Sequence, residues 1–176
     1  MDYAAAYGEL HRIRPKWFQG LSSLEYEGNL RELVAEMRPK PKRVLDYGSG
    51  KGHQYLVSRL HERAGFPLPY CYDPGVRGLH TPPEGRFDLV ICIDVLEHLE
   101  PADVPATLAA LFGLAAPGGA LFLAIGTTLA SARKRLPDGR NMHLCVQSPA
   151  WWHERLAEAA VPGVTLRVFF DERVRA

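Results

Sequence analysis

The feature that most constrains the fold is a short apolar strand that runs directly into a glycine-rich turn. Residues 43–46 are typical of a buried strand, and glycines then occupy every second position of the turn, at Gly48, Gly50 and Gly52. A helix is expected over residues 53–64. A strand, a tight turn and a helix in this order are the first half of a βαβ unit, which indicates a parallel sheet.

The rest of the chain continues this alternation and contains no internal repeat. Residues 1–21 are expected to be irregular, with aromatic side chains scattered among charges. Further strands are predicted at 69–72, 89–93, 120–125 and 164–170. Helices are predicted from Ser22 to about residue 37 and over 101–116. A last helix is predicted to follow an N-cap at Ser148, with Pro149 as its first helical residue. The sequence therefore predicts an α/β fold with an open, mostly parallel sheet, in which residues 1–176 form a single domain.

Composition argues against several classes of protein. The 21 basic and 20 acidic side chains give a net charge of +1, which builds no long-range field for nucleic acid. The longest clean apolar run, residues 120–125, is too short to cross a bilayer, and no signal peptide is indicated. The three cysteines cannot all pair, and no His or Cys spacing suggests a metal site. We expect a cytoplasmic protein with reduced cysteines and no metal.

A ligand site is expected where the first strand meets its helix. Helix N-termini offer backbone amides to polar ligand atoms, and glycine permits close approach. Asp73 ends the next strand, so its carboxylate would accept hydrogen bonds from a ribose diol; the alternative is a simple Asp-Pro-Gly turn. A dinucleotide fingerprint requires glycine where His53 stands, which disfavours a nicotinamide-dependent oxidoreductase, and the P-loop pattern does not fit either.

Three segments resemble, in order, the motifs of class I S-adenosylmethionine-dependent methyltransferases. They are residues 44–52, residues 87–99 with the Leu-Glu-His signature of one large subgroup, and residues 117–121. The resemblance covers roughly residues 42–126, and three linked motifs are more specific than one. It implies a three-layer Rossmann-like sandwich, S-adenosylmethionine as cofactor, and methyltransferase activity.

The resemblance also implies roles for individual residues. Those expected to surround the methionine and ribose parts of the cofactor are Asp46, Gly48, Ser49 and Gly50, with Asp73 at the ribose hydroxyls and Asp94 at the methionine amino end. Asp88 is expected to be structural. Only fourteen residues separate Asp73 from Asp88, where the family normally has a helix and another strand. We therefore expect a reduced class I methyltransferase fold without that edge strand, and an adenine pocket whose only candidates lie around residues 79–81.

Residues for catalysis and acceptor binding carry weaker signals. His98 follows the third strand and is a candidate catalytic residue, with local packing as the alternative. The long segment after residue 125 contributes Asn141 as an acceptor contact and His143 as a second catalytic candidate, with a plain surface loop as the alternative. Trp152 is a candidate for the acceptor wall, although tandem tryptophans more often pack in a core. The segment 1–21 is interpreted as a lid over the cofactor or as a packing flap.

The leading hypothesis is a methyltransferase that acts on a small molecule, with a sugar or natural-product hydroxyl as first candidate, by in-line methyl transfer. The rival is a non-catalytic S-adenosylmethionine-binding protein with a regulatory or partner role, because the domain is trimmed. The sequence carries no signal for the acceptor atom, the pathway or the oligomeric state.

Overall fold

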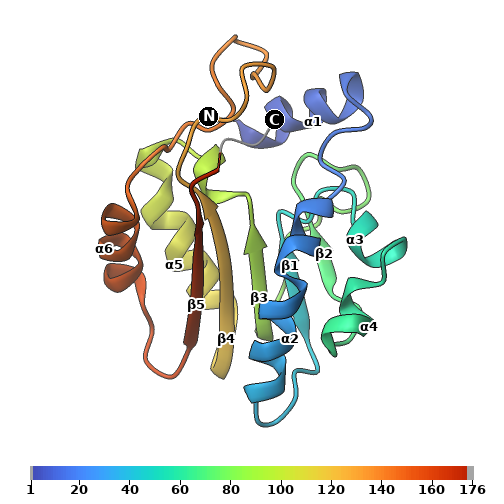
Figure 1. The fold of residues 1–176 in the computed structure, drawn as a ribbon, viewed down its shortest axis with the longest axis vertical. Helices are drawn as coiled ribbons and strands as arrows, with labels where there is room; N and C mark the ends of the chain where they lie inside the picture. Colours follow the sequence, from blue (N-terminus) through green and yellow to red (C-terminus); the bar gives the residue numbers. More distant parts are fainter. Residues whose placement is uncertain (1, 174–176) are drawn as a thin grey trace.

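The computed structural model describes residues 2–173 and shows one sheet between two layers of helices (Figure 1). All five strands are parallel, in the order β2-β1-β3-β4-β5. Their bounds are β1 Val44–Tyr47, β2 Tyr70–Tyr72, β3 Phe87–Ile93, β4 Ala115–Gly126 and β5 Thr165–Asp171. This arrangement confirms the predicted α/β, three-layer, Rossmann-like fold, with every strand parallel.

The helices divide between the two faces of the sheet. The α-helices are α1 Tyr3–Ile13, α2 Glu27–Glu36, α3 His53–Leu56, α4 Leu60–Ala64, α5 Val104–Leu114 and α6 Pro149–Ala159. The short 3₁₀ segments are η1 Leu21–Tyr26, η2 Leu96–His98 and η3 Pro101–Asp103. Side chains of α2, α3 and α4 pack on one face and those of α5 and α6 on the other, while α1 lies above the carboxyl ends of the strands (Figure 1).

Strand β3 shows why its sequence is apolar at almost every position. Val90 and Cys92 belong to the core beneath α5 and α6, whereas Leu89, Ile91 and Ile93 belong to the core beneath α2, α3 and α4. Successive side chains of a strand point to opposite faces, so a strand covered on both sides needs apolar residues throughout.

The expectation of an irregular N-terminus is wrong, because residues 3–13 form helix α1. Asp2 caps this helix by accepting a hydrogen bond from the amide of Ala5 at 3.0 Å, and three consecutive alanines favour it. The helix turns Tyr3, Tyr7 and Leu10 to one side. Leu10 is buried there against Ala130, Leu136 and Met142. This spacing of four and three residues was a helical signal in the sequence.

Three helix boundaries also differ from expectation. Residues 53–64 form two short helices rather than one, and Arg59 between them has a φ of +51°. The helix expected over 101–116 ends at Leu114, because Ala115 already pairs with Phe87 as the first residue of β4. The helical segment near Ser22 starts with Gly20 at its N-cap, whereas the cap at Ser148 is confirmed.

The sheet lacks the edge strand whose absence the sequence predicted. No strand occurs between β2 and β3, so the three-residue β2 is itself the edge. Asp88, at the start of β3, accepts hydrogen bonds from the amides of Lys42 and Arg43 at 2.8 and 2.9 Å. These bonds join the entry of β1 to β3. Of the helices within residues 2–173, none has the length and apolar character that crossing a bilayer would require.

The tandem tryptophans of α6 allow a direct test of packing. Trp152 is fully buried, whereas its neighbour Trp151 is half-buried and contacts the guanidinium of Arg155. We expect Trp152→Ala to lower the free energy of unfolding by about 3–5 kcal/mol, because it removes a large side chain from a closed core. Trp151→Ala should cost less than half as much. Urea denaturation of both variants measures this, and equal losses would contradict it.

Candidate functional site

A cavity of about 460 Å³ opens at the carboxyl ends of the strands, beneath α1 and the segment 127–147. Its volume is in the range of small-molecule sites. Its walls are formed by the turn after β1, the residues that follow β2 and β3, and the segments that cross above them. The site residues expected from the sequence that line it are Gly48, Gly50, Asp73, Asp94, His98 and His143.

The glycine turn does not offer its amides to a ligand, contrary to expectation. The amides of Gly48 and Ser49 donate to the carbonyl of Tyr72, and the amide of Gly50 donates to Asp73 Oδ2 at 3.0 Å. The amide of Lys51 donates to the carbonyl of Phe18 at 2.9 Å. The turn therefore contributes a surface that a ligand can approach closely, not a set of hydrogen-bond donors.

Gly48 and Gly50 are required by contacts within the protein as well as by conformation. Their φ angles are +80° and +57°, a region that side chains with a Cβ rarely adopt. A Cβ on Gly48 would lie 2.2 Å from Val95 Cγ2, and one on Gly50 would lie 2.3 Å from the Phe18 carbonyl oxygen. Any other residue at either position would displace the neighbouring segment.

Asp73 lies on the cavity wall one strand away from this turn. Its Oδ2 accepts from the Gly50 amide, its Oδ1 accepts from the Gly75 amide at 2.9 Å, and His11 Nε2 lies 3.8 Å from Oδ1. A carboxylate oxygen can accept more than one hydrogen bond. Both oxygens therefore keep capacity for a ligand diol while the amides hold the carboxylate in position.

Asp46 and Ser49 do not line the cavity, which corrects their assignment as cofactor contacts. Asp46 is only 2% exposed, and its Oδ2 accepts hydrogen bonds from Tyr55 Oη at 2.8 Å and Gln54 Nε2 at 3.0 Å. It therefore links β1 to α3. Burial raises the pKa of Asp46 to about 6, although these two hydrogen bonds lower it. Ser49 is also buried and donates to the Gly50 carbonyl.

Asp94 lies at the end of β3 on the cavity wall, in an unusual backbone conformation. Its φ is +55°, a value that Asp and Asn tolerate better than most residues but which still costs energy. Its amide donates to the carbonyl of Ala124 at 3.0 Å, which fixes the chain at this point. Strained backbone of this kind is often found where a side chain must be aimed at a ligand.

Two histidines meet at the far side of the cavity. The rings of His98 and His143 are edge to face, with centroids 4.9 Å apart. His98 Nδ1 lies 3.1 Å from the carbonyl of Met142 and 2.9 Å from Tyr7 Oη, and His143 Nδ1 lies 2.6 Å from the carbonyl of Thr128. A carbonyl only accepts, so each Nδ1 carries the proton and each Nε2 carries the lone pair.

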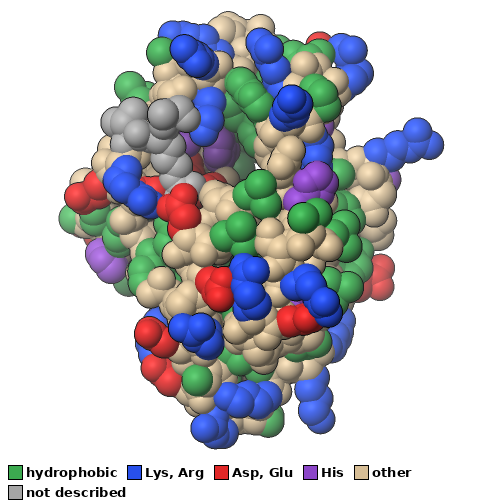
Figure 2. Space-filling view, turned by 45° about the vertical axis from the view of Figure 1, so that its right-hand side comes forward, with side chains coloured by type: hydrophobic (Ala, Val, Ile, Leu, Met, Phe, Trp, Pro, Cys, Tyr) green, Lys and Arg blue, Asp and Glu red, His purple; other side chains and the backbone are tan. Residues whose placement is uncertain are grey.

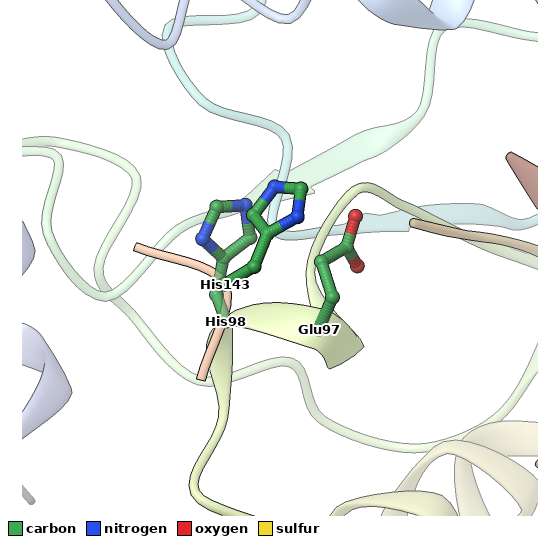
Figure 3. A group of neighbouring side chains, drawn as sticks. All are labelled: Glu97, His98 and His143. Carbon is green, nitrogen blue, oxygen red and sulfur yellow. The ribbon is translucent and has the colours of Figure 1, made fainter. Parts of the chain in front are cut away.

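Glu97 completes this group from the same 3₁₀ turn as His98. Figure 3 shows its carboxylate beside the two imidazole rings, and one donor atom from each of the three residues lies within 4.8 Å of the others. Glu97 is buried, and its Oε1 accepts from the amide of Gly126 at 3.0 Å. Burial and the neighbouring His143 lower the pKa of His98 to about 3, so its ring is neutral at physiological pH.

Two nitrogens and a carboxylate at this separation are also a donor set for a divalent cation. No spacing of residues in the sequence indicates this donor set, because His143 lies far along the chain from Glu97 and His98. Backbone carbonyls that hold the Nδ1–H of both histidines are the usual support of imidazole ligands. Within residues 2–173, these three are therefore the ones suited to hold a metal.

The remaining predicted contacts lie outside the cavity wall. Asn141 binds its own segment: its side chain exchanges hydrogen bonds with the backbone of Ala130 and accepts from the His143 amide at 2.9 Å. It therefore positions His143 and does not face the cavity. Trp152 is buried in the core beneath α5 and α6, so its assignment to the acceptor wall is corrected. Residues 79–81, the expected adenine contacts, do not line the cavity, whereas Pro74 does.

Several cavity residues were not found from the sequence. His11 reaches the cavity from α1, and Lys16 and Lys134 line it from the segments above the strands; Tyr7 also lines it, from the segment interpreted as a lid or a flap. The helical spacing of Tyr7 and His11, four residues apart, was the signal for His11. No local pattern marks the lysines, because their place on the wall depends on how distant segments pack.

The fold and site together define a protein of the class I methyltransferase type. A solved O-methyltransferase family protein from Burkholderia thailandensis has the same fold over 78% of this chain and 51% of its own, with a TM-score of 0.51 and 17% sequence identity. The family described as methyltransferase domain matches residues 21–165, more than half of the chain. This chain belongs to that family, which confirms the resemblance drawn from the three motifs.

Two curated relatives are similar to the chain over the same region. They are the ubiquinone biosynthesis O-methyltransferases of Psychrobacter arcticus and Psychrobacter cryohalolentis, each 30% identical over 147 residues. The match covers 67% of this chain and 55% of each relative. The chain thus spans about half the length of these proteins.

The buried Asp46 predicts a specific pH dependence of stability. Its pKa of about 6 in the folded protein lies above the value near 4 in an unfolded chain. The stability that Asp46 contributes is therefore complete below about pH 4 and is lost as the pH rises through about 6. We expect Asp46→Asn to gain stability relative to the unmodified protein between pH 4 and pH 7.5, by at most about 3 kcal/mol.

Urea denaturation across this range measures the difference. Glu32→Gln is the control, because it makes the same change from carboxylate to amide at an exposed position of α2. If the free energies of unfolding of Asp46→Asn and of the unmodified protein differ by the same amount at every pH in this range, the Asp46 carboxyl ionises normally.

Proposed function

We propose that this protein is an S-adenosylmethionine-dependent methyltransferase that acts on a hydroxyl group of a small molecule. The observation that carries the proposal is the single cavity at the strand ends, where Gly48, Gly50, Asp73 and Asp94 form one side and His98 and His143 the other. The family match supports a methyl donor of this kind, and the names of the Psychrobacter relatives support oxygen as acceptor.

The first side of the cavity suits the cofactor. Asp73 would hold the ribose hydroxyls, the bare backbone at Gly48 and Gly50 would let the nucleoside lie close to the turn, and Asp94 would face the methionine amino group. The sulfonium and the ammonium of the cofactor are both positive. Carboxylates in a partly enclosed cavity favour such charges more than they would in water.

The second side suits the acceptor. The bound cofactor supplies an activated methyl group, so the residues of the chain need only align the acceptor, exclude water and take a proton. Because the pKa of His98 is about 3, its ring stays neutral and is a weak base. We therefore assign proton removal to His143 Nε2, with the Glu97 carboxylate stabilising the imidazolium and the His98 ring packed edge to face against that of His143.

The rival function is a non-catalytic S-adenosylmethionine-binding protein. The reduced edge of the sheet favours it, because the strand missing between β2 and β3 belongs to the cofactor half of the fold. The paired histidines favour the enzyme, since cofactor binding alone gives them no role. The two functions differ in one measurement, which is transfer of a labelled methyl group to any acceptor.

Cofactor binding is tested with adenosylhomocysteine and isothermal titration calorimetry. We expect Asp73→Ala to weaken binding by about 10- to 100-fold, because hydrogen bonds to a charged group are lost. Asp73→Asn, which keeps an oxygen for the Gly50 amide, should lose less. Glu9→Ala removes the same charge from the exposed side of α1 and should change nothing. An unchanged affinity in Asp73→Ala would remove the ribose assignment.

Catalysis is tested by transfer of labelled methyl groups to a panel of phenols, catechols and sugars. His143→Gln should lower kcat by about 10²- to 10⁴-fold, because the general base is lost, while the affinity for adenosylhomocysteine stays within about threefold of the original. The control is His153→Gln, on the exposed side of α6. Full activity in His143→Gln would exclude this residue as the base. Absence of transfer to every acceptor by the unmodified protein would favour the binding function.

A further inference from the structure

The two segments that roof the cavity differ in charge from the rest of the chain. Residues 2–20 and 127–147 together carry seven lysines and arginines against three acidic residues, which leaves fourteen basic and seventeen acidic residues elsewhere. Figure 2 shows several basic side chains and few acidic ones at the upper end of the molecule, where α1 and the segment 127–147 lie, whereas both kinds occur over the rest of this face. Below them, the strand ends present Asp73, Asp94 and Glu97 to the cavity. The site is therefore acidic on the sheet side and basic on the roof.

Most of the basic residues in the roof have partners within it or beside it. Arg12 pairs with Glu9, Arg140 pairs with Glu100 and Asp138, Arg14 lies over the ring of Trp17, and Arg135 donates to two backbone carbonyls. The positive charges of these four arginines are therefore largely stabilised by contacts at the protein surface.

Lys134 differs from these residues. It is half-buried, lines the cavity, and forms no ion pair with any residue among 2–173. Its backbone is held at both ends, since its amide donates to the carbonyl of Ser131 at 2.8 Å and its carbonyl accepts from the amide of Met142 at 3.1 Å. The carbonyl of Met142 in turn lies 3.1 Å from His98 Nδ1, which places Lys134 close to the histidine pair.

A lysine that is partly removed from water without a counter-ion is unfavourable unless a ligand supplies the opposite charge. The cofactor carries one carboxylate of its own, beside the amino group assigned to Asp94 on the sheet side, whereas Lys134 belongs to the segment above the strands that also supplies His143. One ammonium group, without the fork of an arginine, fits a single negative charge. Lys134 lies beside His98 and His143, the residues assigned to the acceptor side of the cavity. We therefore assign this negative charge to the acceptor.

We propose that the methyl acceptor is a hydroxy acid, whose carboxylate binds Lys134 while its hydroxyl lies at His143 and His98. This inference rests on the proposed function and names the substrate class of the same site. In the transfer step, the hydroxyl oxygen forms the new bond to the methyl carbon as the sulfonium–carbon bond breaks. The hydroxyl proton passes to His143, and adenosylhomocysteine leaves neutral at sulfur.

The test compares pairs of acids and their methyl esters as ligands of the protein saturated with adenosylhomocysteine. The pairs are hydroxybenzoates, lactate and glucuronate, each with its neutral ester, and calorimetry measures binding without requiring turnover. We expect at least one acid to bind about tenfold or more tightly than its ester, and its affinity to fall as salt is raised.

Three variants at two adjacent residues identify the group responsible. Lys134→Met should abolish the preference for the acid, and Lys134→Arg, which keeps the charge, should retain most of it. Arg133→Met makes the same change of charge one residue away on the exposed side of the segment and should leave the preference intact. All three variants should bind adenosylhomocysteine as the unmodified protein does.

The remaining results overturn either the hydroxy-acid assignment or the proposed function. Acids and esters that bind equally, or a preference that survives in Lys134→Met, would overturn the assignment of a hydroxy acid. Loss of adenosylhomocysteine binding in Lys134→Met would show that the lysine holds the carboxylate of the cofactor, which also overturns it. Failure of the unmodified protein to bind adenosylhomocysteine would instead refute the proposed function.

Discussion

The site depends on the docking of residues 15–20 against the glycine turn after β1. The amides of Lys51 and His53 donate to the carbonyls of Phe18 and Gln19, and the Lys51 ammonium donates to the carbonyls of residues 15 and 17. The missing Cβ of Gly50 allows this approach. Because the segment is anchored here, α1 lies across the strand ends. A glycine pattern usually interpreted as a ligand cradle thus also serves to attach the roof of the cavity.

The distribution of charge follows from the same arrangement. Parallel strands bring their carboxyl ends to one edge, so acidic residues that follow separate strands converge there. Asp73 and Asp94 remain at the cavity surface, whereas Asp46 turns inward and is satisfied by Tyr55 and Gln54. Segments from outside the sheet then bring basic residues to the opposite side. A cationic cofactor and an anionic acceptor would each meet the charge that stabilises it.

Much of the fold could be predicted from the sequence because its signals are local. The strand at 89–93 is apolar throughout because both of its faces are covered, and the cap at Ser148 opens α6 as its residue type indicates. Helix α1 was missed although the spacing of its apolar residues was present, because the residues that follow it up to Gly20 combine a proline, charges and aromatic side chains without a helical pattern. No local pattern in the sequence predicts that residues 53–64 form two helices. The division occurs at Arg59, whose backbone has a left-handed conformation.

By itself, the sequence determined the alternation of strands and helices, the glycine turn and the family to which the chain belongs, because each of these depends on residues that are close together in the chain. Only the tertiary structure decided which polar side chains share a cavity. It brought His143 beside Glu97 and His98, set Lys134 on the cavity wall with no carboxylate partner among residues 2–173, and buried Trp152 in the core. The physical reason is that these contacts join segments far apart in the chain, so their geometry is fixed by packing and not by local residue preference.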